Sequence, residues 1–161
     1  VAGATEDHLL FVHGDCRLPE GWRPAVAAAL ADPEVALAFF HLHTQPSRCG
    51  AGRLQRAWLR AVDLRSRAAM IPYGDQGFAL RREVFEELGG FPDIPLMEDL
   101  ALARSARARG RIRAVPLAMR TTARRFERHP VRTRLMTATF PLLFRLGVPA
   151  GTLARWYGAV R

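Results

Sequence analysis

The stretch Leu9-Leu10-Phe11-Val12-His13-Gly14-Asp15 decides the fold, because four apolar residues lead directly into a short polar segment. A continuous apolar run of this length is typical of a strand that is buried on both faces. In open α/β sheets, ligands bind just beyond the carboxyl ends of the strands. Residues two positions apart share a face of an extended segment, so we expect His13 and Asp15 to point at one such site.

The segments on either side of this stretch alternate between strand-like and helix-like patterns. The expected strands span residues 9–12, 35–43, 76–80, 112–116 and 118–122. The expected helices span residues 21–30, 53–70, 82–88, 96–109, 132–146 and 150–157, with an interruption or a kink at Pro141. Strands that alternate with helices predict an α/β fold built in layers.

The composition is that of an ordinary globular protein, with 161 residues of which 49% are hydrophobic and 24% charged. The length suits one domain, and no apolar run approaches the ~20 residues that span a bilayer. Two cysteines, Cys16 and Cys49, are too few for a disulfide framework, so we expect a cytoplasmic location. Because the sequence begins at Val1 and not at Met, we expect a fragment or a processed start.

Charge is distributed unevenly along the chain. All 24 basic residues are Arg, against 15 acidic residues, which gives a formal net charge of +9. Residues 1–100 hold ten Arg and fourteen acids, whereas residues 101–161 hold fourteen Arg and one acid. The positive C-terminal third suits an anionic partner, such as nucleotide phosphates, a lipid head group or nucleic acid. The aromatic residues lie mostly in apolar runs, which disfavours nucleic acid.

Three carboxylates are well placed for chemistry: Asp15 and the pair Glu98-Asp99. A carboxylate that follows a strand suits Mg²⁺ or Mn²⁺, which prefer oxygen ligands; the alternative is that Asp15 only begins a turn. One carboxylate of a neighbouring pair can act as a general base that deprotonates a hydroxyl. The alternative for Glu98 and Asp99 is capping of the helix that they begin.

Two further segments are candidate binding elements. Residues 72–77 form a turn with exposed polar groups, and a plain turn is the alternative to a binding loop. Arg124 and Arg125 belong to a basic cluster whose guanidinium groups suit a diphosphate; the alternative is a solvated strand end. The apolar residues 135–148 pack onto the sheet or lie in a membrane interface below a basic face.

Taken in order, these motifs resemble those of the family 2 glycosyltransferases of GT-A fold, in particular the bacterial branch named for its association with radical-SAM/selenodomain proteins. The motifs are His-Gly-Asp at residues 13–15, Pro-Tyr-Gly-Asp-Gln-Gly at 72–77, Gly-Gly-Phe-Pro-x-x-Pro-Leu-Met-Glu-Asp at 89–99 and Ala-Arg-Arg-Phe-Glu at 123–127. The resemblance covers nearly the whole chain, and the block at 89–99 is its most specific part.

The resemblance implies an inverting transfer of a sugar from a nucleotide-diphosphate donor to the hydroxyl of an acceptor. It implies that Asp15 and His13 bind the Mg²⁺ or Mn²⁺ that bridges the donor diphosphate, and that Asp99, beside Glu98, is the catalytic base. The implied substrate-binding residues are Gly74, Asp75 and Gln76 in the sugar and acceptor pocket and Arg124 and Arg125 near the diphosphate.

The resemblance also implies that strands holding the nucleotide precede Val1. We therefore expect an N-terminally truncated chain that is inactive alone, partly unfolded, or an oligomer that covers the exposed sheet edge. Residues 1–128 are the expected catalytic and acceptor part, and residues 129–161 a basic, apolar helical segment packed on it or at a membrane surface. The expected location is the cytoplasm, or the periphery of the inner membrane. The alternative function is a non-catalytic basic module that binds nucleic acid or an anionic membrane.

Overall fold

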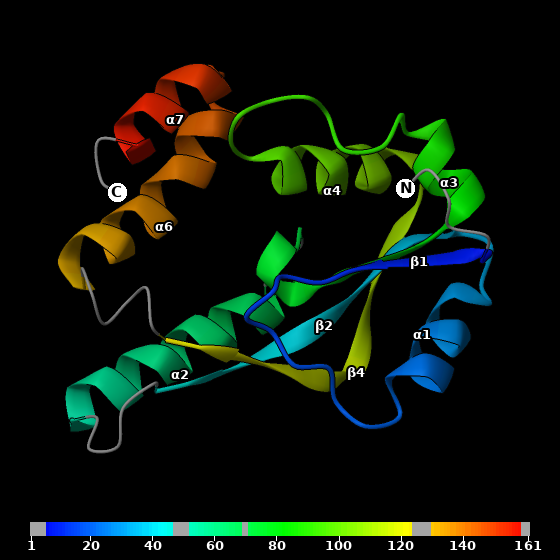
Figure 1. Ribbon diagram of the computed structural model, residues 1–161, viewed down its shortest axis with the longest axis horizontal. Helices are drawn as coiled ribbons and strands as arrows, with labels where there is room; N and C mark the ends of the chain where they lie inside the picture. Colours follow the sequence, from blue (N-terminus) through cyan, green and yellow to red (C-terminus); the bar gives the residue numbers. More distant parts are fainter. Residues whose placement is uncertain (1–5, 47–51, 69–70, 124–129, 159–161) are drawn as a thin grey trace.

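The computed structural model describes residues 6–46, 52–68, 71–123 and 130–158, in which helices surround one four-stranded mixed sheet (Figure 1). The strands are β1 (His8–Phe11), β2 (Val35–Gln45), β3 (Phe78–Arg81) and β4 (Arg111–Thr122). The helices are α1 (Trp22–Leu30), α2 (Arg53–Ala68), the short 3₁₀ helix η1 (Gly74–Gln76), α3 (Arg82–Glu87), α4 (Glu98–Arg109), α6 (Pro130–Arg145) and α7 (Ala150–Gly158). The α/β class is confirmed.

The strand order β1-β3-β2-β4 brings four chain segments to one edge of the sheet. β2 and β4 run parallel, while β3 runs antiparallel to both β1 and β2. The carboxyl ends of β1, β2 and β4 therefore lie at the same end of the sheet as the amino end of β3. We call this end of the sheet, where the strands stop, the rim. The segment after β1 and the η1 segment before β3 both meet at the rim.

The strand β1 differs from the sequence expectation, because it is not buried on both faces. Leu9 is buried, but Leu10 and Phe11 are half-buried, and Val12 just beyond the strand is 36% exposed. The physical reason is its place at the edge of the sheet, where among the described residues it pairs with β3 alone. The apolar run marked a strand correctly but not its position in the sheet.

The two short strands expected at 112–116 and 118–122 form one strand, β4, with a local irregularity. Phe40 pairs with Val115, and the next residue of β2, His41, pairs with Ala118. Pro116 and Leu117 therefore bulge out of the ladder, which is where a residue without a backbone N–H is tolerated.

The sheet has a hydrophobic core on each face. On one face, Leu37, Phe39 and Phe78 pack with buried residues of α3 and α4. On the other face, Ala38 and Phe40 pack with buried residues of α1 and with Val115 and Met119 of β4. The continuous apolar run of β2 is thus explained by burial on both faces of the central strand.

Beyond its short pairing with β3, the edge of β2 is covered by side chains and not by a strand. β3 pairs with β2 only at Ala38 and Phe39. The next carbonyl, that of Phe40, accepts a 3.2 Å hydrogen bond from Nε2 of Gln76. Further along, the Thr44 backbone N–H donates to both carboxylate oxygens of Asp63 in α2 at 3.1 Å, and the Thr44 hydroxyl donates at 2.7 Å. These bonds satisfy backbone groups that an exposed edge would leave open.

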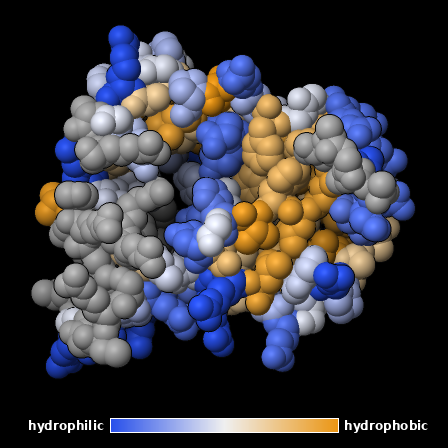
Figure 2. Space-filling model, viewed as in Figure 1, coloured by the Kyte–Doolittle hydropathy of each residue, from blue (hydrophilic) through white to orange (hydrophobic). Residues whose placement is uncertain are grey.

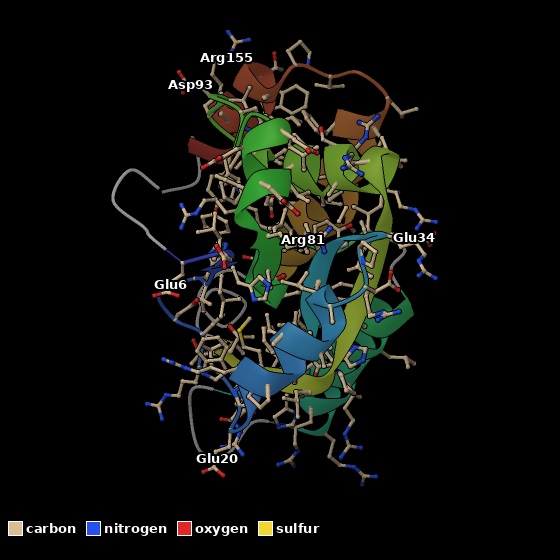
Figure 3. All side chains as sticks on the ribbon, turned by 90° about the vertical axis from the view of Figure 1, so that its right-hand side faces the viewer. Glu6, Glu20, Glu34, Arg81, Asp93 and Arg155 are labelled. Atoms are coloured by element: carbon tan, nitrogen blue, oxygen red, sulfur yellow. The ribbon has the colours of Figure 1, made fainter. Side chains whose placement is uncertain are left out.

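At the end of the sheet opposite to the rim, Arg81 forms hydrogen bonds with the turn between α1 and β2. Its guanidinium donates to the carbonyl oxygens of Leu30 at 2.9 Å, Asp32 at 3.3 Å and Pro33 at 2.9 Å. Figure 3 labels Arg81 near the centre of the view, above helix α1. This clamp holds the amino end of the central strand and leaves the rim open for other contacts.

The last two helices, α6 and α7, lie together at one side of the molecule (Figure 1). α6 continues through Pro141, so the alternative of an interruption there is wrong. Phe140 of α6 and Leu153 of α7 are buried. None of the helices in the described ranges has the length and hydrophobicity that are needed to cross a membrane.

Candidate functional site

The segment that follows β1 crosses the rim and attaches to the far strand of the sheet. Arg17 donates its backbone N–H to the carbonyl of Arg120 in β4 at 2.8 Å, and Arg120 donates back to Arg17 at 3.0 Å. Since β1 and β4 are the two outer strands, residues 12–17 span the whole width of the sheet. This crossing carries the polar residues His13, Asp15 and Cys16 over the carboxyl ends of the strands.

Asp99 at the start of α4 is bound to the η1 segment. The backbone N–H of Gly74 donates to Oδ2 of Asp99 at 2.7 Å, and the N–H of Leu100 donates to Oδ1 at 2.7 Å. Each carboxylate oxygen has a second lone pair, so both retain acceptor capacity. The two backbone donors hold the Asp99 carboxylate in one orientation at the rim.

The His13 imidazole lies close to the same point. A Cβ atom placed on Gly74 would lie 2.9 Å from Oδ2 of Asp99 and 2.9 Å from Nε2 of His13. The distance between Nε2 of His13 and Oδ2 of Asp99 is therefore at most twice 2.9 Å. A Cβ at position 74 would meet both side chains inside normal contact distance, so a larger residue there requires that these side chains move.

The residue before α4 adopts a strained backbone conformation. Met97 has φ 68° and ψ 20°, and it is the one non-glycine residue with a positive φ in the described ranges. A left-handed conformation costs roughly 1–2 kcal/mol for a residue with a Cβ. Strain of this kind is concentrated at functional sites, and here it sets the direction from which Glu98 and Asp99 enter the helix.

Cys16 lies at the rim beside the carboxylate of Asp15 and the backbone of Asp75. Its Sγ lies 3.8 Å from Oδ1 of Asp15 and 3.6 Å from the backbone oxygen of Asp75. Burial raises the pKa of the Cys16 thiol, and the charges of Asp15 and Asp75 raise it further, while a hydrogen bond with Thr121 acts in the opposite direction. Asp15 and Asp75 are therefore close to the same thiol, although sixty positions separate them in the sequence.

The η1 segment joins the two groups of residues. Gly74 contacts Asp99 and His13, and the next residue, Asp75, contacts Cys16 beside Asp15. The sequence predicted sites at Asp15, Asp99 and the η1 segment, and the structure brings all three together at the rim. Figure 2 shows this face of the molecule hollowed to the left of its centre, between α6 and the end of β1 in Figure 1.

Gln76 does not present its side chain to the surface of the rim. It is fully buried, and its amide donates to the Phe40 carbonyl and accepts from the N–H of Tyr73 at 3.1 Å. Both ends of the amide are used inside the protein, so Gln76 shapes the η1 segment from within. We therefore do not include it among the groups that face a substrate.

Glu98, Arg124 and Arg125 complete the predicted set. Glu98 is exposed in the first turn of α4, next to Asp99. Arg124 and Arg125 lie outside the described residues. The described chain reaches Ala123, which is buried and donates its N–H to the carbonyl of Gln45 at 2.8 Å.

Within the described parts of the chain, no three His, Cys, Asp or Glu side chains are arranged as ligands for one metal ion. The predicted ligands, Asp15 and His13, are two residues and so do not form such a group of three by themselves. Both are exposed at the rim. Mg²⁺ is typically bound through one or two carboxylates together with substrate phosphates. The donor set is thus compatible with a cation that arrives with a diphosphate.

A cavity of about 770 Å³ lies between the end of β2 and α2. Its lining includes Thr44, Asp63, Arg56 and Arg60, but none of the predicted site residues. Thr44 pairs with Thr121, which contacts Cys16, so the cavity adjoins the rim site through the sheet. The rim, and not this cavity, is the candidate functional site, because the predicted site residues of the described chain lie at the rim.

Sequence reasoning missed Thr121 and the cavity residues Arg56 and Arg60 as parts of this region, and it did not reveal the left-handed backbone of Met97. The contact of Thr121 depends on the register between β2 and β4, which no local pattern reveals. Arg56 and Arg60 follow the polar spacing of a helix surface, which is equally typical of a solvated face.

Comparisons of the chain with protein-family models, with curated proteins and with solved structures gave no match.

Proposed function

We propose that this chain is the catalytic and acceptor part of a glycosyltransferase that moves a sugar from a nucleotide-diphosphate donor to an acceptor hydroxyl with inversion. The observation that carries the proposal is the meeting of Asp99, Gly74 and His13 at one point of the rim. Next to this point, the Cys16 thiol lies beside the Asp15 carboxylate and the backbone oxygen of Asp75. The family resemblance of the motifs supports the same function. The GT-A type of the sheet belongs to this proposal.

Asp99 is the group that takes the proton from the acceptor. Its carboxylate is held by two backbone N–H groups, and each oxygen keeps one lone pair for a further hydrogen bond. In the proposed step, the acceptor hydroxyl gives its proton to Asp99 while its oxygen bonds to the anomeric carbon. The bond from that carbon to the diphosphate breaks, and the electron pair leaves with the nucleoside diphosphate. A carboxylate fixed before substrate arrives reduces the entropy cost of this alignment.

Asp15 is the proposed ligand for Mg²⁺ or Mn²⁺, with His13 as its predicted companion. Asp15 is exposed at the rim, and its carboxylate oxygens are the hard donors that these cations prefer. A bound cation supplies charge that stabilises a leaving diphosphate. His13 has its Nε2 directed at the Gly74 and Asp99 side of the rim, so it is also placed to orient the base.

Arg124 and Arg125 are the proposed guanidinium partners of the diphosphate. They follow Ala123, whose backbone is bonded to the last residue of β2 at the rim. A guanidinium matches phosphate oxygens with two parallel hydrogen bonds, and such pairing is stronger in a site from which water is excluded.

The experiment measures the release of UDP or GDP from a panel of nucleotide sugars, with Mn²⁺ and with a chelator, using the chain in its natural full-length context. We expect release that depends on Mn²⁺ and is lost in Asp99→Asn but kept in Asp93→Asn, an exposed acid that Figure 3 shows at the upper end of the molecule. Release that is equal in both variants would contradict the proposal. A salt-sensitive shift of nucleic acid without nucleotide release would favour the alternative of a basic binding module.

A further inference from the structure

Helix α6 carries a stripe of large aliphatic side chains that face away from the protein. The stripe consists of Val131, Leu135, Leu142 and Leu146, which are 78%, 62%, 57% and 73% exposed. At about 100° per residue, their spacing places all four within roughly 60° of arc around the helix axis. Leu146 follows the last residue of α6 and keeps the helical pattern, since its N–H donates to the Leu142 carbonyl at 3.0 Å.

The stripe lies opposite the face by which α6 packs against the protein. Phe140 is only 7% exposed, and the same helical spacing places it about 150° from the centre of the stripe. The inner face of α6 is thus already occupied, and the stripe is a second apolar face. Four large aliphatic side chains aligned along one helix differ from single exposed leucines, which need no explanation.

The two C-terminal helices carry charge of one sign. The sequence of α6 and α7 contains four Arg, at positions 132, 134, 145 and 155, and no acidic residue. Arg145 is exposed and lies next to Leu146, on the flank of the stripe. On the neighbouring helix α7, Trp156 is 51% exposed. Aliphatic residues on one face of a helix with Arg beside them are the features of a helix that lies flat in a membrane interface, and an exposed Trp on the adjoining helix is a residue type enriched at such interfaces.

We propose that the α6 stripe docks this protein on an anionic lipid surface, with α6 parallel to the membrane plane. The aliphatic side chains enter the boundary between head groups and acyl chains, and Arg145 on the flank of the stripe meets the lipid phosphates. Each basic residue near an anionic leaflet adds about 1 kcal/mol, which is roughly a fivefold change in affinity. The proposal is independent of the transferase assignment, since it uses none of the residues at the rim.

A second copy of the chain is a less favourable occupant of the stripe. Two copies joined face to face would bring the acid-free segments of both chains together, and like charges across an interface oppose association. An anionic membrane instead neutralises these charges.

The test is flotation of the protein with vesicles of phosphatidylcholine, with and without phosphatidylglycerol. We expect binding to the anionic vesicles that weakens as salt is raised, and little binding to phosphatidylcholine alone. The double variant Leu135→Asp/Leu142→Asp should lose at least tenfold in apparent affinity. Arg145→Ala should lose about fivefold at low salt.

The matched control is Leu64→Asp, because Leu64 is a similarly exposed leucine, 67% exposed, on the different helix α2. This variant should bind vesicles like the unmodified protein. Thermal unfolding of all variants shows that the folded state is kept, and the salt dependence of the unmodified protein tests the charge contribution without any substitution.

Three results would overturn the proposal. The first is equal binding to neutral and anionic vesicles, and the second is equal loss in the double variant and in Leu64→Asp. The third is a dimer, detected by sedimentation without lipid, that the double variant dissociates, because the stripe would then be the interface between two copies.

Discussion

The backbone N–H of Gly74 donates a 2.7 Å hydrogen bond to Oδ2 of Asp99, across 25 positions of sequence. This bond ties the first turn of α4 to the η1 segment at the rim of the sheet. A Cβ on Gly74 would lie within 2.9 Å of both the Asp99 carboxylate and the His13 imidazole, so neither side chain could keep its position. The position of the proposed base thus depends on a glycine that sequence inspection assigns to a turn.

The variant Gly74→Ala tests this dependence. The added Cβ would lie 2.9 Å from both Asp99 and His13, so these side chains must move. We expect the free energy of unfolding to fall by about 1–3 kcal/mol, as in other overpacked sites, with nucleotide release falling as well. The control is Gly14→Ala, since nothing lies within 4 Å of its Cβ position. Equal stability of the two variants in chemical denaturation would show that the contact at Gly74 is not tight.

The variant Asp99→Asn separates the chemical role of the carboxylate from its structural one. An amide cannot take up the proton, so we expect transfer to fall by about 10²- to 10⁴-fold. The amide can accept only one of the two backbone hydrogen bonds, so stability should fall by about 1–3 kcal/mol. Nucleotide binding, measured by calorimetry below the unfolding transition, should be kept. Transfer that falls only in proportion to the folded fraction would leave Asp99 a structural role alone.

The variant Gln76→Leu tests the internal role of this side chain. It leaves the buried Phe40 carbonyl without the amide donor, which should cost about 1–3 kcal/mol of unfolding free energy. The control is Gln45→Leu, because the Gln45 side chain is exposed. Stability is measured by denaturant titration. If Gln76→Leu were as stable as Gln45→Leu while substrate binding fell, Gln76 would belong to the substrate site after all.

The reactivity of Cys16 reports the nearness of Asp15 and Asp75. Burial raises the pKa of this thiol above its ordinary value of 9.0, and the two carboxylates raise it further. A raised pKa keeps the thiol protonated at a pH where a free thiol is half ionised, so alkylation should be slow there and should increase only at higher pH.

The variant Asp75→Asn removes one negative charge and should shift this alkylation profile toward lower pH. Peptide-level mass spectrometry follows Cys16 separately from Cys49. Glu20→Gln, an exposed acid on the same segment of chain, should leave the profile unchanged. A profile that does not respond to Asp75→Asn would place this carboxylate away from the thiol.

Much of the fold was predictable because it follows from periodicity. The apolar run of β2 and the residue pattern of α4 predicted the ends of this strand and this helix to within a few residues. The place of β1 at the edge was not predictable, because an apolar run does not reveal how many neighbours a strand has. Likewise, the two halves of β4 appeared separate since Pro116 interrupts the pattern, and only the register with β2 shows one strand.

The candidate site was predictable in its carboxylates but not in its contacts. Asp15 and Asp99 follow or begin regular elements, and such positions are visible in sequence. The role of Gln76 was not visible, because a buried amide that covers a strand edge looks like any polar turn residue. The same holds for α6, whose exposed stripe was distinguishable from a packed face only once Phe140 was seen to fill the inner side.

The most direct test of the central claim uses Mn²⁺ as a paramagnetic probe in NMR, with UDP or GDP present. If the rim residues form one site, Mn²⁺ should broaden the amide signals of Cys16, Gly74 and Leu100 together, and Asp15→Asn should abolish this broadening. Broadening of the signal of Cys16 without those of Gly74 and Leu100, or broadening that persists in Asp15→Asn, would contradict the claim that Asp15 and Asp99 serve a common site.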